Sequence, residues 1–209
     1  MIKITLLGDS IRTWGYGIKV PEILKDEFEF YQPEENCRFA KNTLRGIFEW
    51  EKDIAGSRII HWNNGLWDVC DVFGDGLFSS EEEYVQNMTR IADLLLERCD
   101  KLIFATTTPV REGNPHIKTK DIIRYNELIV PILEEKGVII NDLFGVLIKD
   151  VEKYIRADDC LHPTEAGFDA CTEAVVKILR EVSKTLGEES KVKNDRVFED
   201  ITKSGAPVY

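Results

Sequence analysis

The sequence predicts an α/β fold in which helices cover both faces of a five-stranded, mostly parallel sheet. Two observations predict it. Short runs rich in β-branched and aromatic residues recur along the chain, and segments with helical periodicity or high charge separate them. Because parallel strands need long crossover connections, this alternation is typical of a three-layer, flavodoxin-like sandwich.

Five segments are expected to form the strands of this sheet. The first, IKITLLG, is apolar and ends in glycine, which is typical of a buried strand followed by a tight turn. FEFYQP has the same character more weakly, and RIIHWNN, KLIFATTTP and GVIINDL repeat the pattern. The expected strands are residues 2–8, 28–33, 58–64, 101–109 and 137–143.

Four helices are expected in the second half of the chain. Residues 79–99 begin with serine and place glutamates close behind it as a capping box, and their apolar residues recur at helical spacing. Residues 118–137 are amphipathic and stop at Gly137, with Pro131 expected to kink or break the last turns. The last two expected helices are residues 143–157 and 163–187.

Composition excludes several classes of protein. The 209 residues carry a net charge of −11 without a dense cluster of lysine and arginine, so neither nucleic acid nor an anionic membrane is an expected partner. Five cysteines form an odd set without CxxC spacing, which argues against a disulfide framework and a zinc ribbon. No signal-peptide pattern and no apolar span of about 18 residues is present, so we expect a cytoplasmic protein.

The domain boundary is expected near Gly187. Residues 1–187 hold all the predicted strands and helices, whereas residues 188–209 are charged and poorly periodic. This tail is expected to pack loosely or to contact a partner subunit of a homo-oligomer.

The stretch ADDCLHPTEAG holds the last of three histidines. Helix capping explains its acidic residues, proline and threonine, but leaves His162 without a purpose. Asp159, three residues before it, has the spacing of an acid that orients a general base. Cys160 lies between them and is poorly placed to act as their nucleophile.

The nucleophile is instead expected where the strands end. Reactive groups of open parallel sheets gather beyond the carboxyl ends of the strands. Ser10 follows the first strand in GDS, and Asn63 and Asn64 follow the third strand, where an amide can donate into the same cleft. Each motif alone is equally compatible with a turn, because Gly, Asp, Ser and Asn are common turn residues.

Together, LLGDS, the asparagine after the third strand and the DxxHP motif before the last helix resemble the SGNH hydrolases, also called GDSL esterases. The resemblance covers nearly the whole domain in the family's order. It implies that Ser10 is the nucleophile, His162 the base and Asp159 its partner, in an esterase that needs no metal or cofactor.

The resemblance also implies an oxyanion hole made from the Ser10 N–H, an asparagine side chain and a second backbone N–H. Asn63 matches the family asparagine best, and Asn64 aligns almost as well after a shift of one residue. The family's glycine in the second motif has no counterpart in ENCRFAKNTLRG, which contains no glycine before Asn42. The second N–H is therefore expected from Lys41 or its neighbour Ala40, because any residue except proline supplies one.

Aromatic and polar side chains near these motifs are expected to line the cleft and bind substrate, and no long apolar lid is visible. We therefore expect a short acyl group, acetyl above all, on a carbohydrate or similar polar alcohol. A lipolytic esterase, a thioesterase and a binding module without catalysis remain alternatives. The expected substrate-binding residues are Trp62, Asn64, Arg12 and Trp67, with Trp14, Tyr16 and Arg111 as further residues at the cleft mouth.

Overall fold

The computed structural model describes residues 1–192 and contains one parallel sheet with strand order β2-β1-β3-β4-β5. Every neighbouring pair of strands is parallel, as the sequence predicted. The strands are β1 (Ile2–Leu7), β2 (Phe28–Tyr31), β3 (Ile59–Trp62), β4 (Lys101–Ala105) and β5 (Ile139–Asn141).

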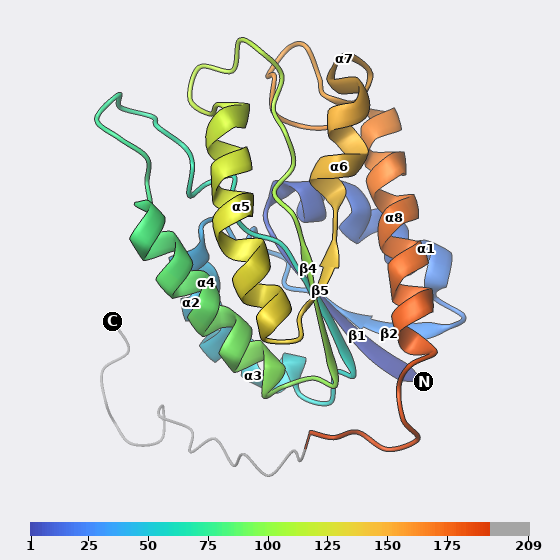
Figure 1. Cartoon of the computed structure of the whole chain (residues 1–209). Coiled ribbons are helices and arrows are strands. Elements are labelled where there is room, and N and C mark those ends of the chain that lie inside the picture. The colour runs from blue at the N-terminus through green and yellow to red at the C-terminus, as the bar shows by residue number, and fades with distance from the viewer. Residues whose placement is uncertain (193–209) are drawn as a thin grey trace.

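Two helical layers cover this sheet (Figure 1). On one face lie α2, α4 and α5, with α4 in contact with each of the other two, and on the other face lie α1, α6 and α8. The helical segments are a π-helical turn (Arg12–Tyr16), α1 (Gly17–Leu24), α2 (Ala40–Glu49), α3 (Glu51–Ile54), α4 (Glu81–Leu96), α5 (Thr119–Glu135), α6 (Leu143–Leu147), a 3-10 turn (Ile148–Asp150), α7 (Val151–Tyr154) and α8 (Glu165–Ser183).

The predicted three-layer α/β fold is confirmed, and one predicted helix is wrong. Residues 143–157 do not form a continuous helix but three short pieces, because Asp150 accepts a hydrogen bond from the Lys153 N–H and starts a new helix there. In α5, Pro131 lies inside the helix, and the helix ends before Gly137, whose φ of 82° only glycine adopts readily.

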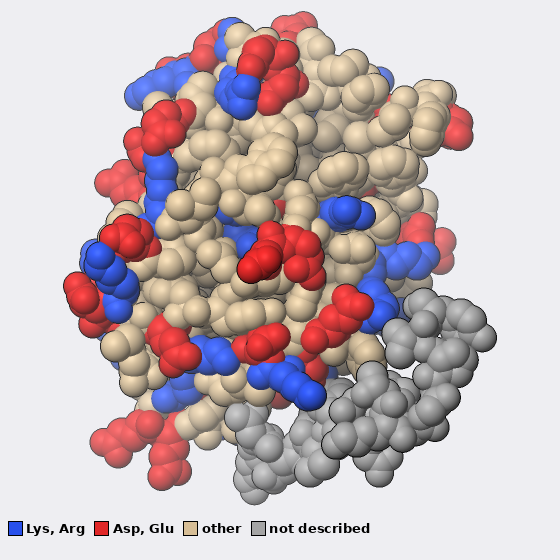
Figure 2. Space-filling view, turned by 180° about the vertical axis from the view of Figure 1, so that it is seen from behind, with Lys and Arg blue, Asp and Glu red and all other residues tan. Residues whose placement is uncertain are grey.

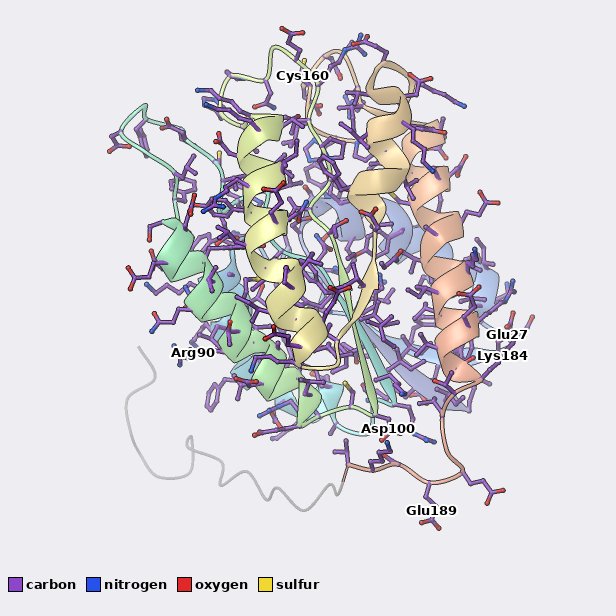
Figure 3. All side chains as sticks on the ribbon, in the orientation of Figure 1. Glu27, Arg90, Asp100, Cys160, Lys184 and Glu189 are labelled. Carbon is purple, nitrogen blue, oxygen red and sulfur yellow. The ribbon has the colours of Figure 1, made fainter. Side chains whose placement is uncertain are left out.

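The core lies between the sheet and its two helical layers, and the four inner residues of β1 are fully buried together with all of β3. Because the strands run in the same direction, their carboxyl ends meet at one end of the molecule. Figure 3 labels Cys160 at that end and Asp100, which precedes β4, at the opposite end. The loops that carry the candidate catalytic residues therefore gather around one edge of the sheet.

The beginning of the predicted tail is held against the opposite end of the sheet. The Arg58 guanidinium donates to the carbonyl of Gly187, just before the tail, at 2.8 Å and to that of Glu189 at 3.3 Å. The Asp100 carboxylate accepts hydrogen bonds from the Ser190 hydroxyl and the Lys191 N–H. The rest of the predicted tail, residues 193–209, lies outside the described residues.

The charged residues on the face in Figure 2 are mixed, with lysines and arginines lying between acidic side chains rather than in one basic patch. Within residues 1–192, no helix is long and apolar enough to cross a bilayer.

Candidate active site

The turn after β1 presents Ser10 at the edge of the sheet. The Asp9 carboxylate accepts a hydrogen bond from the Ile11 N–H at 2.9 Å, and the Asp9 carbonyl accepts from the Arg12 N–H at 3.1 Å. Gly8 is required for packing, because a Cβ at this position would lie 1.9 Å from Oδ1 of Asn63. The chain therefore turns sharply between the end of β1 and the helical turn that follows.

The loop before α8 brings His162 and Asp159 to Ser10. Nε2 of His162 lies 3.0 Å from the Ser10 Oγ, and Nδ1 of His162 lies 2.9 Å from the Asp159 Oδ2. These distances form a continuous hydrogen-bonded chain from a hydroxyl through an imidazole to a carboxylate. The structure thus brings together three residues that the sequence predicted to act together.

The Asp159 carboxylate is held by its own loop. Its second oxygen accepts hydrogen bonds from the N–H groups of Leu161 at 2.9 Å and His162 at 3.0 Å. Burial alone would raise the Asp159 pKa, but the hydrogen bonds from Leu161 and His162 together bring that pKa below its usual value. The carboxylate is therefore ionised near neutral pH and can fix the His162 ring.

A neighbouring segment supports the loop that carries Asp159 and His162. The Arg111 N–H donates to the Cys160 carbonyl at 2.9 Å, and the Asn114 amide donates to the Asp159 carbonyl at 3.3 Å. Cys160 itself has a φ of 54°, in the left-handed region that few residues other than glycine adopt. The loop is thus held in shape by contacts from residues 111–114.

The two asparagines after β3 have different surroundings. The Asn63 side chain lies beneath Gly8, where its Oδ1 accepts from the Tyr16 hydroxyl at 2.7 Å and its amide bonds to the buried Asp9 carboxylate. Both functional groups of Asn63 therefore bind buried residues, Asp9 in the nucleophile turn and Tyr16 in the helical turn that follows it.

Hydrogen bonds to both the oxygen and the nitrogen of its side-chain amide orient Asn64. Its Oδ1 accepts a hydrogen bond from Trp62 Nε1 at 2.6 Å, and its Nδ2 donates to the Arg38 carbonyl at 2.7 Å. An amide nitrogen carries two hydrogens, and these contacts use only one of them. Asn64 thus keeps a fixed N–H donor for which the described residues provide no partner.

The start of α2 lies beside these groups. The Cys37 N–H donates to the Gly8 carbonyl at 3.0 Å, and the Gly8 N–H donates to the Cys37 sulfur, so this segment is tied to the nucleophile turn. Arg38 takes the left-handed conformation, with a φ of 53°, in the stretch where the family glycine is missing. Among residues 1–192, no acceptor binds the N–H of Lys41, which belongs to the open first turn of α2.

A cavity of about 500 Å³ opens beside Ser10 and His162. Trp67, predicted to bind substrate, lines it and is 38% exposed, and Trp14 lines it with 60% of its surface exposed. The Trp14 ring also packs against the His162 ring, with 4.7 Å between their centroids. The remaining lining is mostly apolar and includes Phe39, Leu66, Phe78 and Leu161.

Three of the four predicted substrate-binding residues, Arg12, Trp62 and the fully buried Asn64, do not line this cavity. Arg12 is buried, and its guanidinium donates to the carbonyls of Gly8, Pro33 and Glu35. Trp62 is also fully buried, because it is the last residue of β3 and points into the core toward Phe104. Neither Arg12 nor Trp62 is therefore placed in this cavity, and both side chains instead bind backbone and core groups next to the site.

Asp68 was missed by the sequence analysis. It is fully buried, and burial raises its pKa to about 7, against hydrogen bonds from Ser79 and the Ala40 N–H that lower it. The only signal in the sequence is an acid among apolar residues in GLWDVC, which is too common to single out.

This raised pKa predicts how stability depends on pH. The folded protein binds a proton at Asp68 more tightly than the unfolded chain does, whose pKa is near 3.8. The contribution of Asp68 to stability is therefore present at acidic pH and is lost as pH rises from about 4 through about 7. Relative to Asp68→Asn, the wild type should lose a few kcal/mol over this range, since one pKa unit corresponds to about 1.4 kcal/mol.

Urea unfolding of both proteins at pH 4.5, 6 and 8 measures this difference, and the comparison removes the contribution of groups that both proteins share. Equal pH dependence in the two proteins would contradict the prediction.

Solved structures provide the comparison with known proteins, because no family model and no curated sequence matches the chain. A lipase/acylhydrolase from Enterococcus faecalis has a TM-score of 0.72 at 17% identity, covering 90% of this chain and 99% of that one. An acetylxylan esterase from Geobacillus stearothermophilus has a TM-score of 0.68 at 15% identity, covering 84% and 93%. A member of the lipolytic G-D-S-L family from Veillonella parvula has a TM-score of 0.69 at 14% identity, covering 86% and 99%.

The chain has the SGNH hydrolase fold. Within this fold, the hydrogen-bonded serine, histidine and aspartate lie at the carboxyl edge of the sheet, where such sheets usually hold their ligands. Among residues 1–192, no group of three His, Cys, Asp or Glu side chains is arranged to hold a metal ion.

Proposed function

We propose that this protein is a serine esterase that hydrolyses short-chain acyl esters, acetyl esters above all, of a carbohydrate or similar polar alcohol. The observation that carries this proposal is the continuous contact from Ser10 Oγ to His162 Nε2 at 3.0 Å and from His162 Nδ1 to Asp159 Oδ2 at 2.9 Å. A hydroxyl held against an imidazole, which an ionised carboxylate orients, is the arrangement that activates serine for acyl transfer.

In this mechanism, His162 Nε2 accepts the Ser10 proton while Oγ attacks the ester carbonyl carbon. The imidazolium, stabilised by Asp159, then donates that proton to the departing alcohol, which leaves an acyl-Ser10 intermediate. A water molecule gives a proton to His162 and attacks the acyl carbon, and collapse of the second tetrahedral intermediate releases the acid and returns the proton to Ser10.

The oxyanion of each tetrahedral intermediate needs fixed donors. We assign this part to the Ser10 N–H, the Lys41 N–H and the Asn64 amide. The second hydrogen of Asn64 Nδ2 supports the choice of Asn64, since Trp62 and Arg38 already fix the amide plane. Asn63 Nδ2 also has a second hydrogen, but Asn63 is the weaker candidate because its partners Tyr16 and Asp9 do not line the cavity, whereas Arg38, the partner of Asn64, does.

The cavity supports a small acyl group on a flat or cyclic alcohol. Its aromatic members, Trp14 and Trp67, offer exposed ring faces, and rings of this kind stack on the apolar faces of sugars. One of the similar structures is an acetylxylan esterase, which supports an acetylated carbohydrate as the substrate class. The apolar lining from Leu66, Phe78 and Leu161 favours a second candidate, a lipolytic esterase or thioesterase for longer acyl chains.

Chain-length preference separates these candidates. Initial rates are measured with p-nitrophenyl acetate, butyrate and octanoate, and kcat/KM for acetate is expected to be at least tenfold above that for octanoate. Acetate release from acetylated xylo-oligosaccharides then tests whether the alcohol part of the ester is a carbohydrate. A preference for octanoate would replace the acetylesterase with the lipolytic candidate, and equal hydrolysis by wild type and Ser10→Ala would contradict both.

A further inference from the structure

Asp68 lies between the first turn of α2 and the loop before α4, and it is fully buried. Its carboxylate accepts the Ala40 N–H, at 3.0 Å to Oδ2 and 3.2 Å to Oδ1, and its Oδ1 also accepts the Ser79 hydroxyl at 2.7 Å. Both partners are donors, so both contacts suit an ionised carboxylate. Among the described residues, Asp68 forms no ion pair with a lysine or arginine.

The contact between Asp68 and the Ala40 N–H caps α2 in place of the residue before the helix. The residue before this helix is Phe39, whose side chain has no acceptor for the first N–H groups of the helix. Asp68, 28 residues further along the chain, takes the Ala40 N–H instead. A carboxylate is well placed at a helix N-terminus, since the helix dipole is positive there. The next N–H in the chain, that of Lys41, is left unbound by any acceptor of residues 1–192.

The second contact closes the loop that forms one wall of the cavity. Besides the bond from its hydroxyl, Ser79 donates its N–H to the Asp68 carbonyl at 3.1 Å, and the Phe78 N–H donates to the Cys70 carbonyl at 3.0 Å. These bonds bring together the two ends of residues 69–78, the loop that projects just before α4 in Figure 1. Cys70 and Phe78 at its base line the cavity beside Ser10.

We propose that Asp68 is a positioning residue that joins two parts of the site: it fixes the first turn of α2, so that the Lys41 N–H faces the oxyanion, and it anchors the wall loop 69–78. This inference rests on the proposed esterase function. Asp68 does not touch the reacting atoms, and acts through the backbone of Ala40 and through Ser79.

The two contacts predict different kinetic effects. Asp68→Asn retains the shape of the side chain but replaces one carboxylate oxygen with an NH2 group and removes the negative charge. The Ala40 N–H or the Ser79 hydroxyl then faces a donor where it faced an acceptor. Because the oxyanion forms only in the transition state, we expect kcat for p-nitrophenyl acetate to fall about 10- to 100-fold. Ser79→Ala removes only the side-chain contact of the loop, so we expect KM to rise several-fold with kcat within about twofold.

Asp100→Asn is the matched control. It makes the same chemical change at the opposite end of the sheet, where the Asp100 carboxylate likewise accepts a serine hydroxyl, that of Ser190, and a backbone N–H, that of Lys191. It should keep both kcat and KM within about twofold of wild type. Circular dichroism and melting temperature show whether each variant is folded, because a residue important for folding alone would change melting without separating kcat from KM.

The inference is overturned if folded Asp68→Asn has the same kcat as Asp100→Asn. Should Asp68→Asn not fold, Ser79→Ala decides, since unchanged KM in that variant also overturns it. Failure of the proposed function looks different, because wild type would then hydrolyse the ester no faster than Ser10→Ala.

Discussion

Ser10→Ala is expected to lower kcat for p-nitrophenyl acetate by about three to six orders of magnitude. The substitution removes the attacking oxygen and leaves the His162–Asp159 contact in place, so the site keeps its shape without its nucleophile. Stopped assays at high enzyme concentration measure the residual rate. A fluorophosphonate probe should label the wild type at Ser10, and mass spectrometry locates the label.

His162→Ala should cause a loss of similar size, because both residues act in one proton transfer and their effects do not add. Cys160→Ala is the matched control, since its sulfur lies beside the same loop and contacts the Ala157 carbonyl at 3.5 Å. Cys160→Ala should hydrolyse the ester at the wild-type rate. Retained activity in Ser10→Ala together with a loss in Cys160→Ala would move the nucleophile to the cysteine.

Asn64→Ala is expected to lower kcat by about two to three orders of magnitude with a smaller change in KM. The reason is that its free amide hydrogen is the proposed side-chain donor to the oxyanion, which exists only in the transition state. Steady-state kinetics with p-nitrophenyl acetate measure the split between kcat and KM.

Asn63→Ala is the comparison for this experiment. The substitution leaves the buried Tyr16 hydroxyl and the buried Asp9 carboxylate without the hydrogen bonds that Asn63 makes to them. Its main effect should therefore be a lower melting temperature. The roles are reversed if folded Asn63→Ala loses kcat by two orders of magnitude while Asn64→Ala retains it.

The sequence predicted those parts of the site that depend on local spacing. Asp159 and His162 lie three residues apart, so one loop brings them together, and Ser10 follows directly after an apolar strand. The strands and their parallel arrangement could be predicted equally well, since β-branched runs and amphipathic helices alternate along the chain.

The directions of individual side chains could not be predicted from the sequence in the same way. Asn63 and Asn64 are adjacent, and they point to different partners because successive residues leaving a strand face opposite sides. Arg12 and Trp62 flank the motifs in sequence, but their side chains turn inward to carbonyls and to the core. Asp68 and Ala40 meet only through folding, which no short motif encodes.

The Ser10–His162 contact joins residues 152 positions apart, and this separation has a consequence for biosynthesis. The base lies just before α8, the last helix of the described residues, while the nucleophile lies just after β1, an inner strand of the sheet. Proteins dominated by such long-range contacts and parallel pairing fold slowly. Hydrolysis should therefore be absent from a nascent chain on the ribosome until α8 emerges and docks, and recovery of activity after dilution from urea reports the completion of folding.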